Sequence, residues 1–385
     1  MRDMKIHEAF TKWAVERGVK INGIAAHRFE GRGLGIIAEE NHEANAVLLS
    51  VPLLALRTVN TVRKEISQAL PETTVHNLLA TDLALDETID YAPWRAVLPT
   101  QDSFKDSMPL LWPSSLQALL PPQAAKLLAN QRTKLKQDWG LTSPAYPTIA
   151  YEVYIHSWLL INTRTFYFIT PKQRGKKPSP APKNRYDCLA LNPFADYFNH
   201  MASSAACNVS FSPDGCSITA SGPIKKGEEV YISYGNHSND FLLAEYGFIL
   251  AGDTNRWDEV VLDSHVLDLL SADKKAILQE EGFLGNYVLD RETVCHRTQV
   301  ALRLSFLSVG RWRRFVAGMD DGEKDQVTVD EVLRKLLEKY QADATENIRL
   351  ASCLEEGTAD QRQTLSNRWL QINVLLQVAI DRIKS

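Results

Sequence analysis

Two polar motifs contain the residues of this chain that are best suited to chemistry. Asn199 and His200 end the run Asn-Pro-Phe-Ala-Asp-Tyr-Phe-Asn-His, and Tyr234 follows 34 residues later in the run Ile-Ser-Tyr-Gly. Amide, imidazole and phenol groups all form hydrogen bonds, and each needs a polar partner when it is buried. In an ordinary turn or strand the backbone supplies that partner, whereas in a binding site a ligand does. The order of the motifs therefore matters more than either motif alone.

A third motif, Gly33-Leu34-Gly35, lies far upstream. Glycine allows a backbone to approach a ligand closely and to adopt positive φ. These glycines fall between strand-like runs rather than at the start of a helix, which disfavours the phosphate-binding loop of dinucleotide-binding folds. A simple turn remains the alternative for so short a motif.

The surrounding sequence predicts the elements that position these motifs. Residues 4–18 have helical spacing, and the apolar runs 35–38 and 46–51 are typical of strands. Residues 60–165 are cut by prolines into short helices, with 149–168 as the best long helix. Asp214-Gly215 predicts a hairpin, followed by a strand at 230–233. The remainder is predicted to be helical, in the segments 263–281, 292–317, 327–342, 345–355 and 360–383.

Composition narrows the class of protein. The 385 residues suffice for two domains, and the net charge of −4 lacks the basic excess of a chain that binds nucleic acid over its whole surface. The five cysteines include no CxxC pair, so neither a zinc site nor a disulfide framework is predicted. No signal peptide and no membrane span is visible. We expect a soluble intracellular protein, cytoplasmic or nuclear, without a membrane or nucleic-acid partner.

One stretch stands apart. Residues 171–185 contain six basic residues and four prolines but no acid. This composition predicts a mobile, solvated loop. A bare surface insertion is the simpler interpretation, and electrostatic steering of an acidic partner is the alternative.

Taken in order, the motifs resemble those of the SET-domain protein methyltransferases. The carriers are Gly31-Arg-Gly-Leu-Gly-Ile36, the Asn199-His200 run, and Tyr231-Ile-Ser-Tyr-Gly-Asn-His-Ser-Asn-Asp-Phe-Leu-Leu-Ala-Glu-Tyr-Gly-Phe248. About 160 residues separate Gly35 from Asn199, and no cysteine cluster follows Tyr246. This combination is similar to the Rubisco large-subunit methyltransferase-like branch, and the last run is similar to fungal ribosomal-protein lysine methyltransferases.

The resemblance implies an α+β fold in two domains. Residues 1–254 would form a SET-domain β-fold with a pseudoknot, interrupted by a helical insert at about 60–185. Residues 255–385 would form an all-α domain that binds the protein substrate, with the boundary near 252–256.

The resemblance also implies roles for individual residues. Tyr234 would be the catalytic tyrosine, and Tyr234 and Tyr246 would line the channel for the substrate lysine. The ordinary pKa of a tyrosine, near 10, argues against Tyr234 as a simple general base. S-adenosyl-L-methionine would be held by a set of backbone and side-chain groups: Gly33, Leu34, Gly35, Arg164, Asp196, Asn199, His200 and Phe248. Arg164 would pair with the carboxylate of this cofactor, although a helix-surface arginine is the alternative. No metal is implied.

Three alternatives remain open at this point. Some members of this branch methylate histidine instead of lysine, and others have lost activity and act as binding modules. A helical scaffold with an incidental SET-like segment is a third. The intact set Asn199, His200, Tyr234 and Tyr246 favours an enzyme that methylates a protein, possibly a ribosomal protein. The substrate, the methylation state and the oligomeric state are not predicted.

Overall fold

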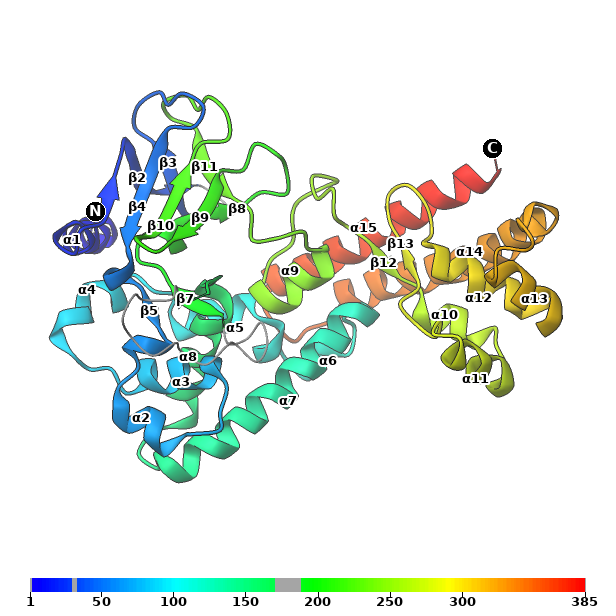
Figure 1. Ribbon diagram of the computed structural model, residues 1–385, viewed down its shortest axis with the longest axis horizontal. Helices are drawn as coiled ribbons and strands as arrows, with labels where there is room; N and C mark the ends of the chain where they lie inside the picture. Colours follow the sequence, from blue (N-terminus) through cyan, green and yellow to red (C-terminus); the bar gives the residue numbers. More distant parts are fainter. Residues whose placement is uncertain (1, 30–32, 170–187, 385) are drawn as a thin grey trace. The chain divides into compact units, whose positions relative to one another are not determined.

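The computed structural model describes residues 2–29, 33–169 and 188–384, and the chain forms two compact units (Figure 1). The first unit comprises Met1–Lys105 and Ala129–Asn236, and the second comprises Asp106–Leu128 and His237–Ser385. The basic stretch 171–185 lies outside the described residues, as do Gly31 and Arg32 of the glycine motif. Each unit is described separately below.

The strands of the first two sheets described below gather at one end of the first unit, with helices α2 (Lys64–Ala69) and α3 (Val75–Ala84) at the other (Figure 1). One antiparallel sheet has the order β1-β4-β10-β9. Its strands are β1 (Lys20–Ile21), β4 (Val47–Pro52), β9 (Asn208–Ser212) and β10 (Gly215–Thr219). The predicted Asp214-Gly215 hairpin joins β9 to β10. Gly215 is required there, because a Cβ would lie 2.0 Å from the Val51 carbonyl oxygen.

A second sheet contains all three motifs. Its order is β2-β3-β11-β8, with strands β2 (Ile24–Phe29), β3 (Gly33–Ala38), β8 (Asn199–His200) and β11 (Glu229–Ile232). Strand β11 runs antiparallel to β3 and parallel to β8, with Tyr231 opposite Asn199. The glycine motif, the Asn-His pair and the segment that ends at Tyr234 therefore lie on three neighbouring strands.

The helices up to residue 164 confirm one part of the predicted pattern and correct another part. Helix α1 (Arg2–Glu16) buries Phe10, Trp13 and Ala14, but Ile6, which the helical spacing places on the same face, is exposed. The longest helix of the insert, however, is α7 (Pro122–Ala145), not the predicted 149–168 helix, which is α8 (Tyr151–Arg164). Pro122 begins α7, where its missing N–H is not needed, so this proline starts a helix instead of ending one. The shorter helices of the predicted insert are α4 (Ala92–Arg95), α5 (Gln101–Ser107) and α6 (Ser114–Gln117), of which α6 belongs to the second unit.

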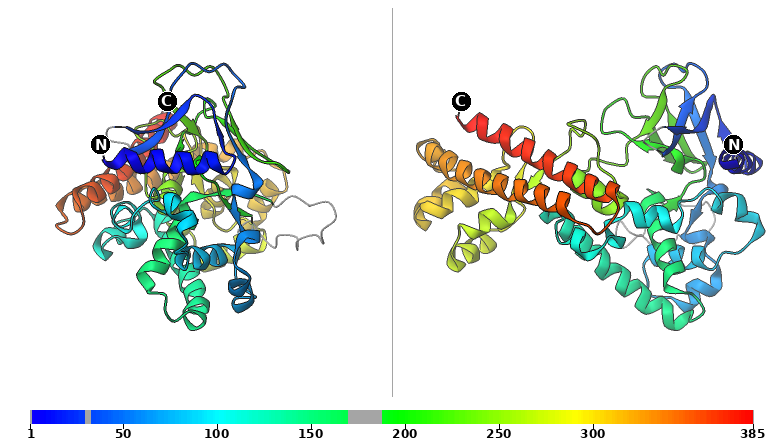
Figure 2. Two further views of the ribbon diagram at one scale, coloured as in Figure 1. Left: turned by 90° about the vertical axis from the view of Figure 1, so that its left-hand side faces the viewer. Right: turned by 180° about the vertical axis from the view of Figure 1, so that it is seen from behind.

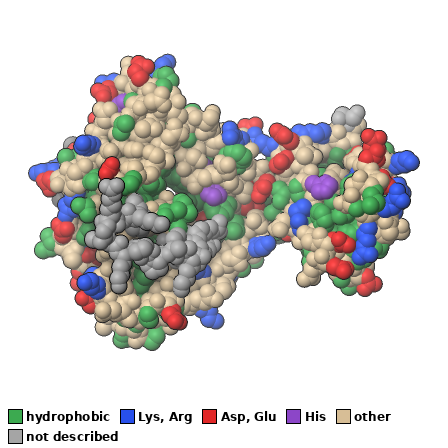
Figure 3. All heavy atoms as spheres, viewed as in Figure 1, with side chains coloured by type: hydrophobic (Ala, Val, Ile, Leu, Met, Phe, Trp, Pro, Cys, Tyr) green, Lys and Arg blue, Asp and Glu red, His purple; other side chains and the backbone are tan. Residues whose placement is uncertain are grey.

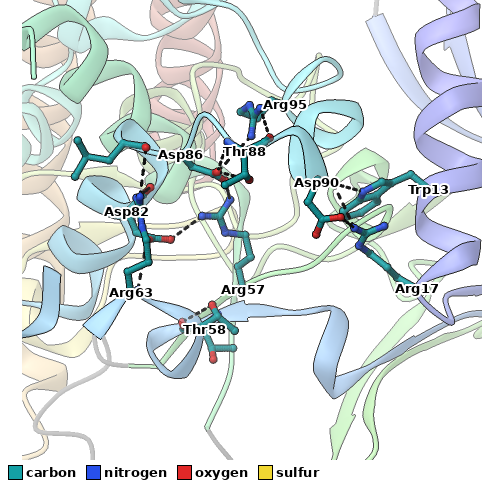
Figure 4. Close-up of polar contacts among 12 residues, drawn as sticks. Trp13, Arg17, Arg57, Thr58, Arg63, Asp82, Asp86, Thr88, Asp90 and Arg95 are labelled. Carbon is teal, nitrogen blue, oxygen red and sulfur yellow. Dashed lines mark hydrogen bonds and ion pairs between the residues drawn. The ribbon is translucent and has the colours of Figure 1, made fainter. Parts of the chain in front are cut away.

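A third sheet, β5-β7-β6, leads into the Asn-His run. Its strands are β5 (Arg57–Thr58), β6 (Thr165–Tyr167) and β7 (Leu189–Leu191), so β6 follows α8 directly and β7 precedes Asn192. Arg57 ties this sheet to α3 through buried ion pairs with Asp82 (2.6 Å) and Asp86 (2.7 Å), as Figure 4 shows. Because removing one partner leaves an unpaired buried charge, this cluster makes the position of β5 costly to change.

The second unit is mainly helical, as predicted. Its helices from residue 237 onward are α9 (Asn239–Tyr246), α10 (Asp263–Asp268), α11 (Ala272–Glu280), α12 (His296–Phe306), α13 (Val309–Val316), α14 (Gln326–Cys353) and α15 (Ala359–Lys384). The segments 327–342 and 345–355 were predicted separately but belong to the single helix α14, which pairs with α15 along its length (Figure 2). The short strands β12 (Val260–Val261) and β13 (Val288–Leu289) were not predicted, because two residues are too few to give a strand pattern.

Short 3-10 turns connect several of these elements. They are η1 (Leu53–Ala55), η2 (Val59–Thr61), η3 (Ile89–Tyr91), η4 (Pro109–Leu111), η6 (Ala195–Tyr197) and η7 (Glu323–Asp325). Turn η6 matters most for function, since it lies inside the Asn-His run.

The second unit is stabilised by its apolar core more than by its surface. The core includes Trp312, Leu337, Tyr340 and Trp369, each at most 4% exposed. Side chains of both charges are interspersed over α10 to α14 on the face drawn in Figure 3. Ion pairs between such exposed side chains contribute little to the free energy of unfolding. No described helix is long and apolar enough to cross a membrane.

Candidate active site

The Asn199 side chain is held by two neighbouring strands. Its Nδ2 donates to the Leu34 carbonyl oxygen of β3 (3.0 Å) and to Glu229 Oε1 of β11 (2.8 Å). If the amide were flipped, its oxygen would face two acceptors, so the orientation is fixed by chemistry. Both amide hydrogens are used in these bonds. The carbonyl oxygen takes part in neither of them and is the group that can accept a hydrogen bond from a ligand.

The glycine motif lies directly beside this amide, so the structure brings two of the predicted motifs together. A Cβ on Gly35 would lie 2.7 Å from both Asn199 Nδ2 and Glu229 Oε1, which no real side chain tolerates. Gly33 is needed for a different reason, since its φ is +79° while the space around it is open. Leu34 contributes its carbonyl oxygen. Gly35 is therefore required by space, and Gly33 by backbone conformation.

His200 and Tyr234 are in direct contact. The backbone N–H of Tyr234 donates to His200 Nδ1 (3.0 Å), and the two rings are stacked with centroids 5.1 Å apart. The Tyr234 hydroxyl donates to the Phe198 carbonyl oxygen (2.7 Å). Burial raises the pKa of Tyr234; Arg164 opposes this shift and Asp196 adds to it. The phenol is therefore neutral near pH 7 and serves as a hydrogen-bonding group.

Arg164 and Asp196, both predicted as cofactor-binding residues, are in direct contact. Arg164 ends α8, and its Nη1 donates to the Asp196 backbone oxygen (2.9 Å). Burial raises the pKa of the Asp196 carboxyl to about 6, against the lowering effects of Arg164 and Trp94. Arg164 Nε and Asp196 Oδ1 are buried without a hydrogen-bond partner within the described residues. Because such groups are costly when unsatisfied, this corner of the fold has polar capacity that a ligand can use.

The sequence reasoning missed Glu229 and Tyr231. Glu229 Oε2 accepts a hydrogen bond from the Tyr231 hydroxyl (2.6 Å), while its other oxygen holds Asn199. The two residues are separated by one position on β11, whose alternate residues Val230 and Ile232 are buried. This alternation places Glu229 and Tyr231 on one strand face. It was the available signal, but the predicted strand began at residue 230 and so left out Glu229.

The other two predicted residues, Tyr246 and Phe248, belong to the second unit. Tyr246 ends α9, and their ring centroids lie 6.3 Å apart. Gly247 between them has φ +80°, and a Cβ there would lie 2.9 Å from the backbone of Ser107. Phe241 lies 6.4 Å from Tyr246 and stacks on His237 at 4.0 Å. The structure therefore gathers an aromatic cluster around Tyr246 that includes two residues absent from the predicted set.

Comparison with known proteins agrees with this arrangement. Residues 33–235 match the SET domain family model, and residues 258–382 match the model of the ribosomal lysine N-methyltransferase 2 C-terminal domain. The predicted boundary near 252–256 falls in the gap between the two matches.

Individual relatives and a solved structure extend the match over the chain. SET domain-containing protein 4 of Mus musculus is 26% identical over 92% of this chain and 85% of its own length. Ribosomal lysine N-methyltransferase 2 of Saccharomyces cerevisiae is 27% identical over 67% of this chain, which spans only 61% of that relative.

A crystal structure of the SET domain of LSMT bound to lysine and AdoHcy has a TM-score of 0.65 at 17% identity. The match covers 99% of this chain and 91% of that one. The predicted α+β fold is thus confirmed. The SET domain family model covers more than half of the residues of this chain, including all three motifs. The chain therefore belongs to the SET-domain family.

Proposed function

We propose that this chain is an S-adenosylmethionine-dependent protein-lysine N-methyltransferase. The observation that carries the proposal is the Asn199 amide, which Leu34 and Glu229 hold with its carbonyl oxygen available as an acceptor. A fixed acceptor beside a glycine-rich strand suits the ammonium group of a bound amino acid. The relatives named for lysine methylation support the same activity.

The first unit would hold the cofactor. Asn199 Oδ1 would accept from the ammonium group of its methionine part, and the backbone of Gly33, Leu34 and Gly35 would lie along it. Arg164, whose Nε is buried and has no hydrogen-bond partner among the described residues, would pair with the carboxylate. His200 supports the Tyr234 backbone and would line the same site. We assign Asp196 to the site through its contact with Arg164.

Tyr234 would orient the acceptor amine. The cofactor supplies an electrophilic methyl group on a sulfonium, and a neutral lysine amine attacks the methyl carbon while the thioether leaves. Lysine has an ordinary pKa near 10.4, so the site must favour its neutral form, which an apolar environment and a neighbouring positive charge both do. The buried, neutral Tyr234 phenol suits this task because it hydrogen-bonds the amine without supplying a negative charge. Tyr246 and Phe248 would contribute aromatic faces that attract the cationic substrate, and Phe248 would also contact the cofactor.

For the substrate, we propose a ribosomal protein, with residues 255–385 as the part that binds it and the cytoplasm, the nucleus or both as the place of action. The support is the family match of residues 258–382. Histidine as the acceptor and a catalytically inactive binding module are the competing possibilities.

Cofactor binding and methyl transfer test the proposal in sequence. Calorimetry would measure S-adenosylmethionine binding to the wild type and to Asn199→Ala, which we expect to bind more weakly. Labelled cofactor and a ribosomal protein fraction from cells lacking this protein would follow, with amino-acid analysis of the product. Methyl-lysine is the expected product, and methyl-histidine would overturn the choice of acceptor. Binding without transfer would favour the inactive module, and no binding would overturn the proposal.

A further inference from the structure

The second unit contains a buried polar cluster where α15 contacts the first turn of α9. The Arg368 side chain is fully buried, and its guanidinium donates to Asp240 Oδ1 and to Asp258 Oδ2, both at 2.6 Å. A third donor, Nη2, reaches the Glu259 carbonyl oxygen (3.2 Å). The buried charge of Arg368 is thus satisfied by three residues that lie more than 100 positions away in the sequence. Truncation of Arg368 would remove the buried cationic partner of both carboxylates, and truncation of either aspartate would remove one of the two ion pairs of the guanidinium.

Amide side chains extend this cluster to the backbone on both sides of Phe248. The Asn239 backbone N–H donates to Asp258 Oδ1 (2.9 Å), and Asn239 Oδ1 accepts from the Leu250 N–H (3.1 Å). Gln371 of α15 completes the connection: its Oε1 accepts from Asn239 Nδ2 (2.9 Å), and its Nε2 donates to the Leu250 carbonyl oxygen (2.7 Å). The helix start at 239–240 is therefore tied to Arg368 and Gln371, and the backbone at 250 is tied to Gln371.

The segment between these anchors carries Tyr246 and Phe248. Helix α9 ends at Tyr246, and Gly247 donates to the Leu243 carbonyl oxygen in the left-handed conformation that closes a helix. Residues 239–250 thus form a closed loop of chain whose start is held by Arg368 and Gln371 and whose end is held by Gln371. We propose that Arg368 and Gln371 are positioning residues, which keep the aromatic pair Tyr246 and Phe248 in place for methyl transfer. This inference rests on the proposed function.

A purely structural role is the competing explanation, since buried ion pairs often serve only to hold helices together. The apolar face of α15 already does that, with Leu365, Ile372 and Leu376 fully buried in the core of the unit. The polar contacts of Gln371 are directed elsewhere, to Asn239, Leu250 and Gly252. Gln371 therefore reaches the backbone that flanks Phe248, which helix packing alone does not require.

The test variant is Gln371→Met, which keeps the length of the side chain and removes its hydrogen bonds without burying a charge. Gln377→Met is the matched control. Gln377 lies on the same helix and makes side-chain hydrogen bonds to other residues, Gln341 and Asp381. Arg368→Lys is a second variant that retains the charge with fewer donors.

Two readouts separate positioning from stability. Hydrogen exchange followed by mass spectrometry should be faster in the peptide that contains Leu250 in Gln371→Met and unchanged there in Gln377→Met. With labelled S-adenosylmethionine and a ribosomal protein fraction, Gln371→Met should lower kcat by about 10- to 100-fold with KM within about threefold, because a small misplacement of a positioning group is costly. The distribution of mono-, di- and trimethylated product should also change.

The contradicting results are specific. If Gln371→Met lowers the melting temperature while kcat and the product distribution match Gln377→Met, the role is structural and the inference is wrong. If hydrogen exchange in the peptide that contains Leu250 is unchanged in Gln371→Met, Gln371 does not anchor this segment and the inference is wrong. A wild type that transfers no methyl group would instead refute the proposed function, and the exchange measurement would still report on the anchoring of residues 239–250.

Discussion

Replacing Glu229 by alanine should weaken cofactor binding although we assign Glu229 no contact with the cofactor. Its carboxylate holds the Asn199 amide at 2.8 Å and also accepts from the Tyr231 hydroxyl at 2.6 Å. A hydrogen bond to a charged group contributes about 1.5 to 3 kcal/mol. Without it, Asn199 keeps only the bond to Leu34, and its amide is free to turn away from the orientation that presents its carbonyl oxygen.

The expected loss of affinity follows from these contacts. Each 1.4 kcal/mol corresponds to about a tenfold change in Kd, so we expect S-adenosylhomocysteine to bind about 10- to 100-fold more weakly to Glu229→Ala. Calorimetry measures this directly, and the demethylated product is a suitable ligand because it is stable. Glu228→Ala is the matched control. Glu228 is exposed, accepts from the backbone N–H of Lys225 (3.0 Å) and carries the same charge.

A double-mutant cycle makes the test decisive. If Glu229 acts through Asn199, the change to Glu229→Ala should cost little further affinity in an Asn199→Ala background. Fully additive losses would mean that Glu229 acts independently of Asn199. Unchanged affinity in Glu229→Ala alone would refute the reasoning, because the amide would then be held well enough without it.

Three further outcomes are expected from single substitutions. Gly35→Ala should raise the cofactor Kd at least about tenfold, because its Cβ would enter the space of Asn199. The control Gly140→Ala, whose added Cβ has no described atom within 4 Å, should leave the cofactor Kd unchanged and stabilise α7 by about 0.5 to 1 kcal/mol. Equal cofactor affinity in the two variants would contradict this expectation. Tyr234→Phe should keep cofactor affinity within about threefold while lowering kcat by about 100-fold or more, as expected for a group that acts on the acceptor amine; equal losses of both would indicate a structural tyrosine. Asp196 has its pKa raised to about 6 by burial, so it binds a proton more tightly when folded, and its contribution to the free energy of unfolding should fall by at most about 3 kcal/mol as the pH rises from about 4 to 6. Urea titrations should find that decline reduced in Asp196→Asn, and the same pH dependence in both proteins would count against the buried carboxyl.

Much of the site could be predicted because its residues are chemically distinctive and close in sequence. Asn199 and His200 are adjacent, and Tyr234 follows after a predictable hairpin at Asp214-Gly215. Their order sufficed to indicate the family, and the structure brings them together, because Asn199 and His200 form β8 and Tyr234 follows the neighbouring strand β11.

Glu229 could not be found in this way. Its role depends on the register that sets Tyr231 opposite Asn199, and strand register is a tertiary property. Two adjacent acids before a strand have the pattern of a solvated turn, and Glu228 does face solvent. Which of the two acids faces the neighbouring strand is decided by pairing, not by local sequence.

Arg368 illustrates the same limit in the helical unit. An arginine on a long helix is normally exposed, and its helical spacing gives no reason to expect burial. It is buried because Asp240 and Asp258, far away in sequence, are both within 2.6 Å. The helix boundaries missed at α7 and α14 have a related cause, since tertiary packing overrides the local signals on which the prediction relied.

Tyr234-dependent methyl transfer is the central claim, and one measurement tests it most directly. Labelled S-adenosylmethionine would be added to an extract of cells lacking this protein, together with either the wild type or Tyr234→Phe. The account predicts label in a discrete protein band with the wild type and a large reduction with the variant, and mass spectrometry of the band should find methyl-lysine. Equal labelling by both proteins would contradict the assigned role of Tyr234, and no labelling by the wild type despite bound cofactor would contradict the activity itself.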